Sequence, residues 1–484
     1  MKKLLSLILA IWVMLFCGTL LSNHAAEGDL LWDRAYGGDD WDEAWAVVQT
    51  PDGGYALAGM TQSFGAGFQD MWLVKTNASG DTLWTRTYGG PSYDRAYALI
   101  VTQDGGLLLV GNTQSYGAGS NDFWAVKTDA AGDTQWTRTY GDDADDYGRG
   151  VVQTADDGFA LVGSRYYGSG NVLLVRTDTE GNQLWSRSYG GYFDEQGNSI
   201  AQTADGGFLL VGTTRSFGAG GSDAWMLKVD ANGDSLWSQT FGDELGDFGY
   251  WGAETDGGYV LAGIIQPPDG SDSGALLAKA DPQGDSLWAH AYVLGEYTEA
   301  YAAILTADAY LLTGLGGSMI QPGQVLLFKT DLNGNQLWVE GYGASELDDL
   351  GFSIIENSDG DYIIAGRSSV LLGDYEAYLL AVEGPGTGVE PVHETAPMDF
   401  ALYPAHPNPF NAKTALSYQL PADSYVTLRI YDTAGRLVEN LVEGRRLAGR
   451  HELTLDAGHL PSSVYVARLT AGEVAQTQKL VLMK

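Results

Sequence analysis

The segment AWAVVQTPDGGYALAGMTQSFGAGFQDMWLVKTNASGDTLWTRTY, residues Ala44–Tyr88, decides the fold. It contains four short apolar runs, and each of the first three ends in a turn signal: Asp52-Gly53, then a Gly-rich loop, then NASGD. An Asp-Gly pair between apolar runs is typical of a tight hairpin, because Gly adopts the positive φ that such turns need. The segment therefore predicts four antiparallel strands joined by short connections.

The same unit recurs along the chain, and a Trp marks each copy. The spacings between successive marker residues are 52, 52, 49, 52, 51 and 50, for Trp32, Trp84, Trp136, Trp185, Trp237, Trp288 and Trp338. Hairpin-connected groups of four strands that repeat at this period are typical of propeller blades. We expect each Trp to pack between neighbouring blades, where burial of its ring stabilises the fold.

The strand count predicts how the ring closes. The segment LLWDRAYGG at Leu30–Gly38 is a fourth-strand segment that precedes every first strand, and the last unit ends at its third strand, AYLLAVE. Pairing these two segments completes the last sheet and leaves no open edge. We therefore predict an all-β fold with a seven-bladed β-propeller, closed by an N-terminal strand, over residues 27–383.

The N-terminal residues predict export. Lys2 and Lys3 precede an apolar run from Leu4 to Leu21, which indicates a signal peptide over residues 1–26. An uncleaved membrane anchor is the alternative, because the run is long enough to approach a bilayer span. Removal of the signal leaves no predicted membrane span, and it removes Cys17, the single cysteine of the sequence.

The C-terminal part has a different composition. GPGTGVEPVHETAP, from Gly384, is rich in Gly and Pro and predicts a linker over residues 384–399. Short alternating strands such as TALSYQL and VYVARLT follow, and they predict a small β-sandwich over residues 400–484.

Three stretches of this region resemble a known family: YPAHPNPFNAKTALSYQLP from Tyr403, LRIYDTAGRLV from Leu428 and SSVYVARL from Ser462. They are similar to the C-terminal sorting domain of the type IX secretion system, although Ser463 stands where that family usually has Gly. The resemblance implies an immunoglobulin-like fold related to the flagellar hook cap. It also implies that residues 400–484 bind the type IX secretion machinery, and that the protein is secreted or lies on the outer-membrane surface of a Gram-negative bacterium.

Charge limits the partners of the propeller. Residues 27–383 contain 15 Lys and Arg against 52 Asp and Glu, a net charge of −37. Such a surface repels nucleic acid and anionic lipid, so neither is an expected partner. It favours solubility and cation binding, and adaptation to a salty exterior is the simpler explanation.

An acidic position recurs at the entrance to the first strand of each unit. It is occupied by Asp42, Asp94, Asp146, Glu195, Asp247, Thr298 and Asp349. One hypothesis is a ring of carboxylates that holds a hard cation such as Ca²⁺. The alternative is architectural, with each carboxylate accepting backbone N–H bonds from a neighbouring blade and so fixing the spacing of the blades.

Aromatic residues provide the second candidate site. Three positions after the recurring carboxylate come Trp45 and Tyr97, which we expect near the channel mouth. Gly-flanked loops between the second and third strands carry Phe64, Tyr116, Tyr167 and Phe217. These rings would suit a hydroxyl-rich or cationic ligand, or they pack down onto strand ends while Gly makes the turn.

No catalytic constellation stands out. His290 is the one histidine of residues 27–383, which leaves neither a zinc cluster nor a Ser-His-Asp arrangement there. We therefore predict a non-enzymatic, secreted or cell-surface binding or adhesion propeller whose ligand is polysaccharide, matrix or protein. A secreted carbohydrate-active hydrolase or lyase that uses carboxylate pairs and a structural surface component are the alternatives.

Overall fold

The computed structural model describes residues 27–167, 169–266, 273–294, 297–318, 321–343, 348–371 and 374–385, and residues 400–483 with gaps at 404, 406–407, 409, 421–423, 434, 447–448 and 472–473. The chain divides into two compact units, residues 1–387 and 388–484, each described by itself below. The predicted signal peptide (1–26) and most of the predicted linker (384–399) lie outside the described residues. Within the described ranges, no helix is long and apolar enough to cross a membrane.

Each sheet of the first unit has four antiparallel strands. In the first blade, β2 (Asp42–Gln49) pairs with β3 (Tyr55–Thr61), β3 pairs with β4 (Asp70–Thr76), and β4 pairs with β5 (Thr82–Tyr88). Gly53 in the first turn has a φ of 82°, a conformation that side chains with a β-carbon rarely adopt. Local turn chemistry therefore fixes the order of strands within a blade.

The other blades repeat this arrangement, and we name the four strands of a blade A to D from the channel outward. The A strands are β2, β6 (Asp94–Val101), β10 (Asp145–Gln153), β14 (Glu195–Gln202), β18 (Phe248–Thr255), β22 (Tyr297–Leu305) and β26 (Leu350–Glu356). The B strands are β3, β7 (Leu107–Thr113), β11 (Phe159–Tyr167), β15 (Phe208–Thr214), β19 (Gly258–Ile265), β23 (Ala309–Ser318) and β27 (Tyr362–Leu371). The C strands are β4, β8 (Asp122–Thr128), β12 (Ser169–Thr177), β16 (Asp223–Val229), β20 (Gly274–Ala280), β24 (Gln321–Asp331) and β28 (Asp374–Val382). The D strands are β5, β9 (Thr134–Tyr140), β13 (Gln183–Tyr189), β17 (Ser235–Phe241), β21 (Ser286–Tyr292), β25 (Gln336–Tyr342) and β1 (Leu30–Tyr36).

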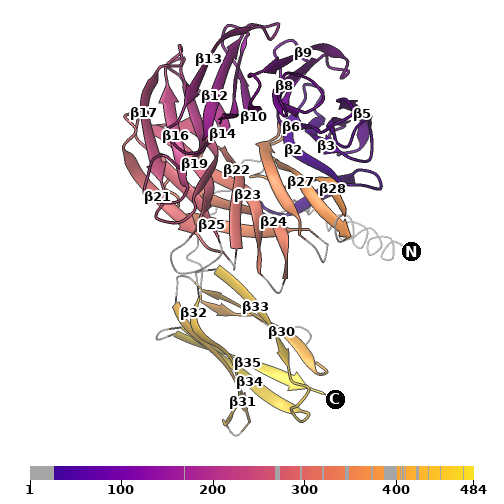
Figure 1. Ribbon diagram of the computed structural model, residues 1–484. Coiled ribbons are helices and arrows are strands. Elements are labelled where there is room, and N and C mark those ends of the chain that lie inside the picture. The colour runs from indigo at the N-terminus through magenta and orange to yellow at the C-terminus, as the bar shows by residue number, and fades with distance from the viewer. Residues whose placement is uncertain are drawn as a thin grey trace, which may run out of the picture. The chain divides into compact units, whose positions relative to one another are not determined.

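The N-terminal strand closes the ring, as the sequence predicts. β1 pairs antiparallel with β28, with Trp32 opposite Ala381 and Tyr36 opposite Ala377, and the last sheet has the order β1-β28-β27-β26. Successive A strands contact each other around the ring, and β2 contacts β26 to complete the circle. Figure 1 shows the sheets arranged around a central axis. The prediction of a seven-bladed, strand-closed propeller is therefore confirmed.

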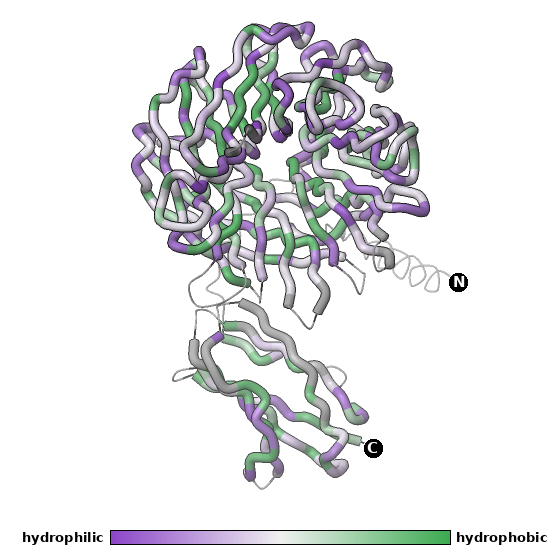
Figure 2. The backbone as a smooth tube through the Cα atoms, in the orientation of Figure 1, coloured by the Kyte–Doolittle hydropathy of each residue, from purple (hydrophilic) through white to green (hydrophobic). Residues whose placement is uncertain are grey.

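The core of the propeller lies between the blades rather than at its centre. Seven clusters of buried apolar side chains each draw residues from two neighbouring sheets; one of them joins Leu57 and Val74 of the first blade to Ile363 and Leu379 of the last. Figure 2 shows hydrophobic stretches along the strands inside the ring and hydrophilic stretches toward the outer edge. Each blade therefore buries apolar surface against two neighbours, which stabilises the closed ring.

The D strand of a blade packs against the C–D turn of the next blade. A β-carbon on Gly80 would lie 2.6 Å from the Trp32 ring, so the Trp packs directly on the C–D turn of its neighbour. The Tyr36 hydroxyl donates to the carbonyl oxygen of Gly80 at 2.6 Å. The same bond recurs from Tyr88, Tyr140, Tyr189, Tyr292 and Tyr342 at 2.5–2.8 Å. The predicted packing of Trp between blades is thus accompanied by a Tyr–Gly hydrogen bond that the repeat pattern did not reveal.

Buried cations on the C strands pair with the A–B turns. The Lys127 ammonium donates to both carboxylate oxygens of Asp104, at 3.0 and 2.9 Å, and to the Thr128 carbonyl oxygen at 2.9 Å. Lys75 with Asp52 and Lys228 with Asp205 repeat the pair at 3.0 Å. Partial burial would raise the pKa of the Asp104 carboxyl, but hydrogen bonds from Thr102, Lys127 and the Gly106 N–H outweigh it and lower the pKa to about 2.

This pair gives the propeller a testable pH dependence. Because the folded-state pKa of Asp104 lies below its ordinary value of 3.8, its contribution to stability is fully present above that value and is lost as the pH falls toward 2. The difference in unfolding free energy between the wild type and Asp104→Asn should therefore be largest at neutral pH and shrink between about pH 4 and 2. Urea unfolding at several pH values measures this difference, and a difference that grows toward low pH would contradict it. The wild type alone would not show this effect. Burial raises the pKa of Asp70 and Asp247, so these carboxyls change the stability with pH in the opposite direction to Asp104, and only the difference from the variant isolates Asp104.

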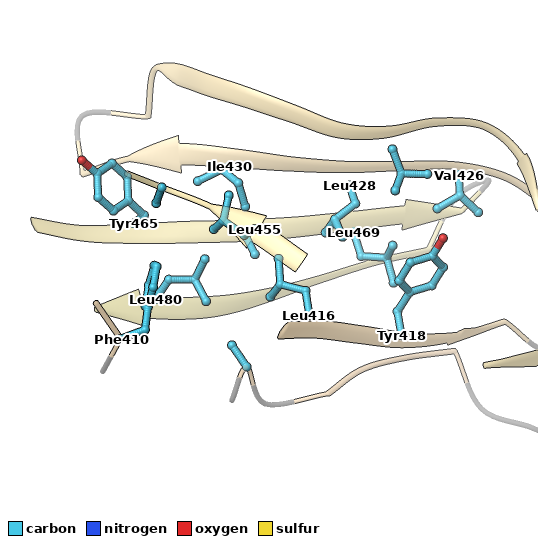
Figure 3. Close-up of a cluster of buried hydrophobic side chains, with 14 of the residues drawn as sticks. Phe410, Leu416, Tyr418, Val426, Leu428, Ile430, Leu455, Tyr465, Leu469 and Leu480 are labelled. Atoms are coloured by element: carbon cyan, nitrogen blue, oxygen red, sulfur yellow. The ribbon is translucent and has the colours of Figure 1, made fainter. Parts of the chain in front are cut away.

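The second unit is a β-sandwich, as predicted. One sheet has the order β29-β30-β33 and the other β32-β31-β34-β35. The strands are β29 (Ala401–Leu402), β30 (Lys413–Leu420), β31 (Ser424–Asp432), β32 (Leu437–Arg446), β33 (Gly449–Asp456), β34 (Ser463–Ala471) and β35 (Val474–Leu482). Figure 3 shows Leu416 and Tyr418 of one sheet facing Leu428 and Leu469 of the other, and all four are buried.

The Asn-Pro-Phe-Asn motif attaches the start of the sandwich to its last strand. The Asn408 amide nitrogen donates to the Lys479 carbonyl oxygen at 2.8 Å, and its amide oxygen accepts from the Val481 N–H at 2.9 Å. Phe410 adds two backbone hydrogen bonds to the same strand and buries its ring in the core. The side chain of Asn408 thus replaces a pair of backbone groups along the β35 edge.

Candidate binding site at the channel mouth

Every A strand carries a β-bulge at the same position. In β2 the register shifts between Ala44 and Ala46, so that Trp45 is the extra residue. The equivalent residues in the other blades are Tyr97, Arg149, Asn198, Tyr250, Tyr301 and Phe352. Bulges redirect a side chain away from the regular alternation of a strand and are frequent next to functional sites. We call these seven residues the bulge ring.

The bulge ring surrounds the central channel. All seven of its residues line one cavity of about 430 Å³, together with small and apolar residues such as Ala46, Leu99 and Ile200. Small residues before the bulge let the A strands approach closely, since a β-carbon on Gly249 would lie 2.6 Å from the Gly212 carbonyl oxygen of the previous blade. The predicted candidates Trp45 and Tyr97 are therefore both in the channel wall.

The rings contact one another in two groups. Trp45 and Tyr97 have ring centroids 4.8 Å apart, and the Arg149 guanidinium lies 4.0 Å from the Tyr97 ring centroid. On the other side, Tyr301 lies 5.4 Å from Tyr250 and 5.5 Å from Phe352. Burial raises the pKa of the Tyr250 and Tyr301 hydroxyls, and the negative charge of Glu299 raises it further. Both hydroxyls therefore remain neutral at physiological pH.

Two further cavities open beside the bulge ring. One, of about 490 Å³, is lined by Arg95, Tyr97, Asp145, Tyr147, Arg149, Ser164, Tyr166 and Gln196. The other, of about 340 Å³, is lined by Gly246, Phe248, Tyr250, Ile264, Gln266, Ser273, Glu299 and Tyr301. We call them the arginine cavity and the glutamate cavity. Both volumes lie in the range of roughly 300–1,000 Å³ that is common for small-ligand sites.

The recurring carboxylates lie elsewhere. Asp42, Asp94, Asp146, Glu195, Asp247 and Asp349 have at most 1% of their surface exposed, and none of them lines the three cavities described above. Asp94 accepts hydrogen bonds from the Gly90 N–H at 2.9 Å, from the Ser115 hydroxyl at 2.7 Å and from the Thr113 hydroxyl. Asp94 thus joins the D–A loop that enters its blade to the B–C region of the same blade, and these three bonds do not come from the blade on its other side.

The other blades show the same use of the carboxylate. Asp42, Asp146, Glu195 and Asp247 each accept from the backbone N–H four residues earlier, at 2.8–3.0 Å. Thr298 replaces the carboxylate in one blade and accepts the equivalent bond from the Leu294 N–H at 2.9 Å. Among the residues that the structure describes, no group of three or more His, Cys, Asp or Glu side chains is placed to hold a metal ion. Binding of Ca²⁺ by this ring of carboxylates stays a prediction.

The predicted loop aromatics are half-exposed. Phe64, Tyr116 and Phe217 have 45%, 49% and 45% of their surfaces exposed. Their rings lie 5.6–5.9 Å from the Trp72, Trp124 and Trp225 rings of their own blades. The side chain of the fourth candidate, Tyr167, lies outside the described residues. The three described rings therefore each cover a strand end and present one face to solvent.

The D–A and B–C loops share one rim of the propeller, and two exposed aromatic pairs on this rim were not predicted from the sequence. Phe68 stacks on Tyr93 with centroids 5.5 Å apart, and Tyr192 meets Phe193 edge to face at 5.4 Å. Tyr192 is 85% exposed and Phe68 is 68% exposed. Phe68, Tyr192 and Phe193 lie in B–C and D–A loops at positions where the other blades carry no aromatic residue, so the repeat pattern gives no signal for the two pairs.

The one histidine of the propeller is structural. His290 on β21 packs against the Trp288 ring at 5.0 Å, and its Nε2 lies 3.1 Å from the Asn333 carbonyl oxygen in the next blade. This outer-strand position is remote from the channel, which is lined by A strands.

The comparison with protein families finds a match in the second unit. Residues 404–483 match the family described as the secretion system C-terminal sorting domain. A comparison of the chain with curated protein sequences finds no match.

Solved structures give remote likenesses. PorZ of Porphyromonas gingivalis, titled an essential bacterial surface component of the type IX secretion system, is 11% identical over 90% of this chain and 69% of its own, with a TM-score of 0.38. The β-propeller domain of the Trilobed protease from Pyrococcus furiosus is 12% identical over 73% and 94%, with a TM-score of 0.39. Sqt1 from Chaetomium thermophilum is 15% identical over 75% and 87%, with a TM-score of 0.42. Likenesses this remote assign no function to the chain.

The fold and the match together describe the organisation of the chain. The all-β ring comes from the sheet topology, and the matched residues 404–483 include Asn408 and Phe410, which attach the start of the sandwich to β35. The chain thus combines a bacterial β-propeller with a C-terminal sorting domain of the type IX secretion system, which indicates secretion to the cell surface or outer membrane.

Proposed function

We propose that the propeller is a non-enzymatic binding module that holds a hydroxyl-rich polysaccharide at the channel mouth. The observation that carries this proposal is the bulge ring, in which five of seven residues are aromatic and all line one cavity. Aromatic rings offer flat apolar faces for the C–H faces of a sugar, and phenol groups add hydrogen bonds at their edges.

Two features of the site support binding rather than hydrolysis. Two carboxylates of the A strands that carry the bulge ring are already engaged: Glu43 forms a salt bridge with Arg367, and Glu299 accepts a hydrogen bond from the Tyr301 hydroxyl. The exposed rings of Phe68, Tyr93 and Tyr192 on the same rim extend the aromatic surface beyond the channel. A polymer that crosses the rim would therefore meet several stacking positions.

The proposal is tested with the mature protein and a panel of polysaccharides. Retention on immobilised glycan and the release of new reducing ends are measured together. We expect retention without reducing ends, and Tyr97→Ala should weaken binding about tenfold, because it removes a stacking surface and its contact with Trp45. Leu184→Ala is the matched control, since Leu184 is 59% exposed on an outer strand, far from the channel in the sheet order.

The other outcomes distinguish the alternatives. New reducing ends would favour the hydrolase or lyase. Neither retention nor cleavage on any glycan would favour a structural surface component. Equal retention of the wild type and a folded Tyr97→Ala variant would remove the channel mouth as the binding site.

A further inference from the structure

Arg149 carries an unpaired positive charge within a strongly acidic propeller. Residues 27–383 carry a net charge of −37, and most of their basic side chains form salt bridges, including Lys75, Arg86 and Arg367. Arg149 is exposed and forms no salt bridge with any residue in the described part of the chain. An unpaired guanidinium in the channel wall of an acidic propeller is available to a ligand.

The position of Arg149 suits recognition of a planar anion. Its guanidinium lies over the Tyr97 ring at 4.0 Å, which fixes the plane of the group and leaves its N–H edges free. A guanidinium fork matches the two oxygens of a carboxylate, and such charge-assisted bonds are stronger than neutral ones.

A second guanidinium lines the same cavity. Arg95 is oriented by a hydrogen bond from its Nε to the Gln69 amide oxygen at 2.6 Å, and it lies 5.9 Å from the centroid of the Tyr93 ring. Asp145 is the one acidic residue of the arginine cavity, and its Oδ1 accepts from the Asn121 N–H and side-chain amide at 2.9 and 3.3 Å. The arginine cavity therefore has a net positive lining.

The remaining lining residues suit a sugar. The rings of Tyr147 and Tyr166 meet edge to face at 5.8 Å, and Ser164 and Gln196 supply a hydroxyl and an amide. Flat aromatic faces combined with neutral hydrogen-bonding groups fit a hydroxyl-rich ring better than an extended peptide carboxylate.

The glutamate cavity provides a contrast within the same molecule. It uses the equivalent positions of blades further round the ring, Phe248 and Tyr250 on β18 and Glu299 and Tyr301 on β22, and its one charged residue is Glu299. The two cavities therefore share the aromatic bulge-ring positions but differ in charge. An acidic unit of a polymer would be accepted at one and repelled at the other.

We propose that the arginine cavity selects a uronic acid residue of a polysaccharide, with Arg149 and Arg95 binding its carboxylate. This inference deepens the proposed function and rests on it. The propeller as a whole repels polyanions, so the selection depends on these two guanidinium groups. At physiological ionic strength, where charges more than about 8 Å apart are screened, the local pairs dominate.

The test compares oligogalacturonate with the same oligomers after methyl esterification, which removes the charge and keeps the sugar ring. Affinities of the mature protein for both are measured by calorimetry at physiological salt. The wild type should bind the free acid about tenfold more tightly than the ester, and Arg149→Gln should reduce that ratio to about twofold or less. Arg187→Gln is the matched control, because Arg187 lies over the Trp185 ring at 5.4 Å on the outer strand β13 and should leave the ratio unchanged.

Each other outcome has a defined meaning. Equal binding of acid and ester by the wild type, or an unchanged ratio in Arg149→Gln, would overturn the selection of a uronate while leaving polysaccharide binding intact. Binding of poly-glutamate without binding of any sugar would overturn both proposals in favour of an acidic protein partner. A protein that binds neither oligomer but retains a neutral glycan would overturn the uronate inference alone.

Discussion

Deletion of residues 27–38 is expected to prevent the propeller from closing. It removes β1, whose Trp32 and Tyr36 join the cluster between the last and first blades, and it leaves β28 with an unpaired edge. It also removes the bond from the Tyr378 hydroxyl to Asp33 at 2.6 Å. The loss of two large aromatic contacts costs on the order of 5 kcal/mol or more, which is comparable with the whole stability of many domains.

Thermal unfolding and size-exclusion chromatography with light scattering measure the effect. We expect a much lower melting temperature together with dimers or larger species, because an exposed strand edge pairs with other chains. A monomeric protein with an unchanged melting temperature would show that the ring does not depend on this strand.

A circular permutant supplies the matched control. Gly28 and Asp29 already exchange backbone hydrogen bonds with Glu383 at 2.9 Å, so a short connection can place residues 27–38 directly after β28. The permutant keeps every residue of the deleted segment and every blade contact. It should recover the monomeric state and most of the lost stability, whereas failure to do so would locate the effect of the deletion elsewhere.

Asp94→Ala is expected to destabilise the protein by about 3 kcal/mol. Asp94 is fully buried and accepts from Gly90, Ser115 and Thr113, so its removal leaves three donors without partners. Asp94→Thr should cost less, because Thr298 shows that a hydroxyl at this position accepts the loop N–H. Asp143→Ala is the control, since Asp143 is an exposed carboxylate of another D–A loop and should change stability by less than about 0.5 kcal/mol.

The same experiment separates an architectural carboxylate from a metal ligand. If the carboxylates act by holding loops, EDTA leaves the melting temperature of the wild type unchanged and added Ca²⁺ does not raise it. If they hold a cation, EDTA lowers the wild-type melting temperature toward that of Asp94→Ala, because a ligand that binds the folded state stabilises it. The second result would support the calcium hypothesis and contradict the loop-holding role.

The candidate site was only partly visible in the sequence. Alignment of the units identified Trp45 and Tyr97 as positions near the channel, because the repeat places one residue per blade at an equivalent point. It did not distinguish the buried carboxylate from a channel residue, since both recur with the same period. The exposed pair Tyr192–Phe193 was missed because no other blade repeats it.

Local chemistry determined the fold. Asp-Gly turns, a repeated Trp and one surplus outer strand at Leu30–Gly38 were enough to predict seven blades and their closure, because hairpins depend on neighbouring residues. The tertiary structure alone decided which side chains share a cavity. The bulges in β6 and β10 turn Tyr97 and Arg149 into the channel, and the packing of these two blades brings Arg95 and Tyr97 of one beside Arg149 and Tyr166 of the other. Those contacts join residues from different sheets, and their geometry depends on strand register and blade packing, which no short stretch of sequence encodes.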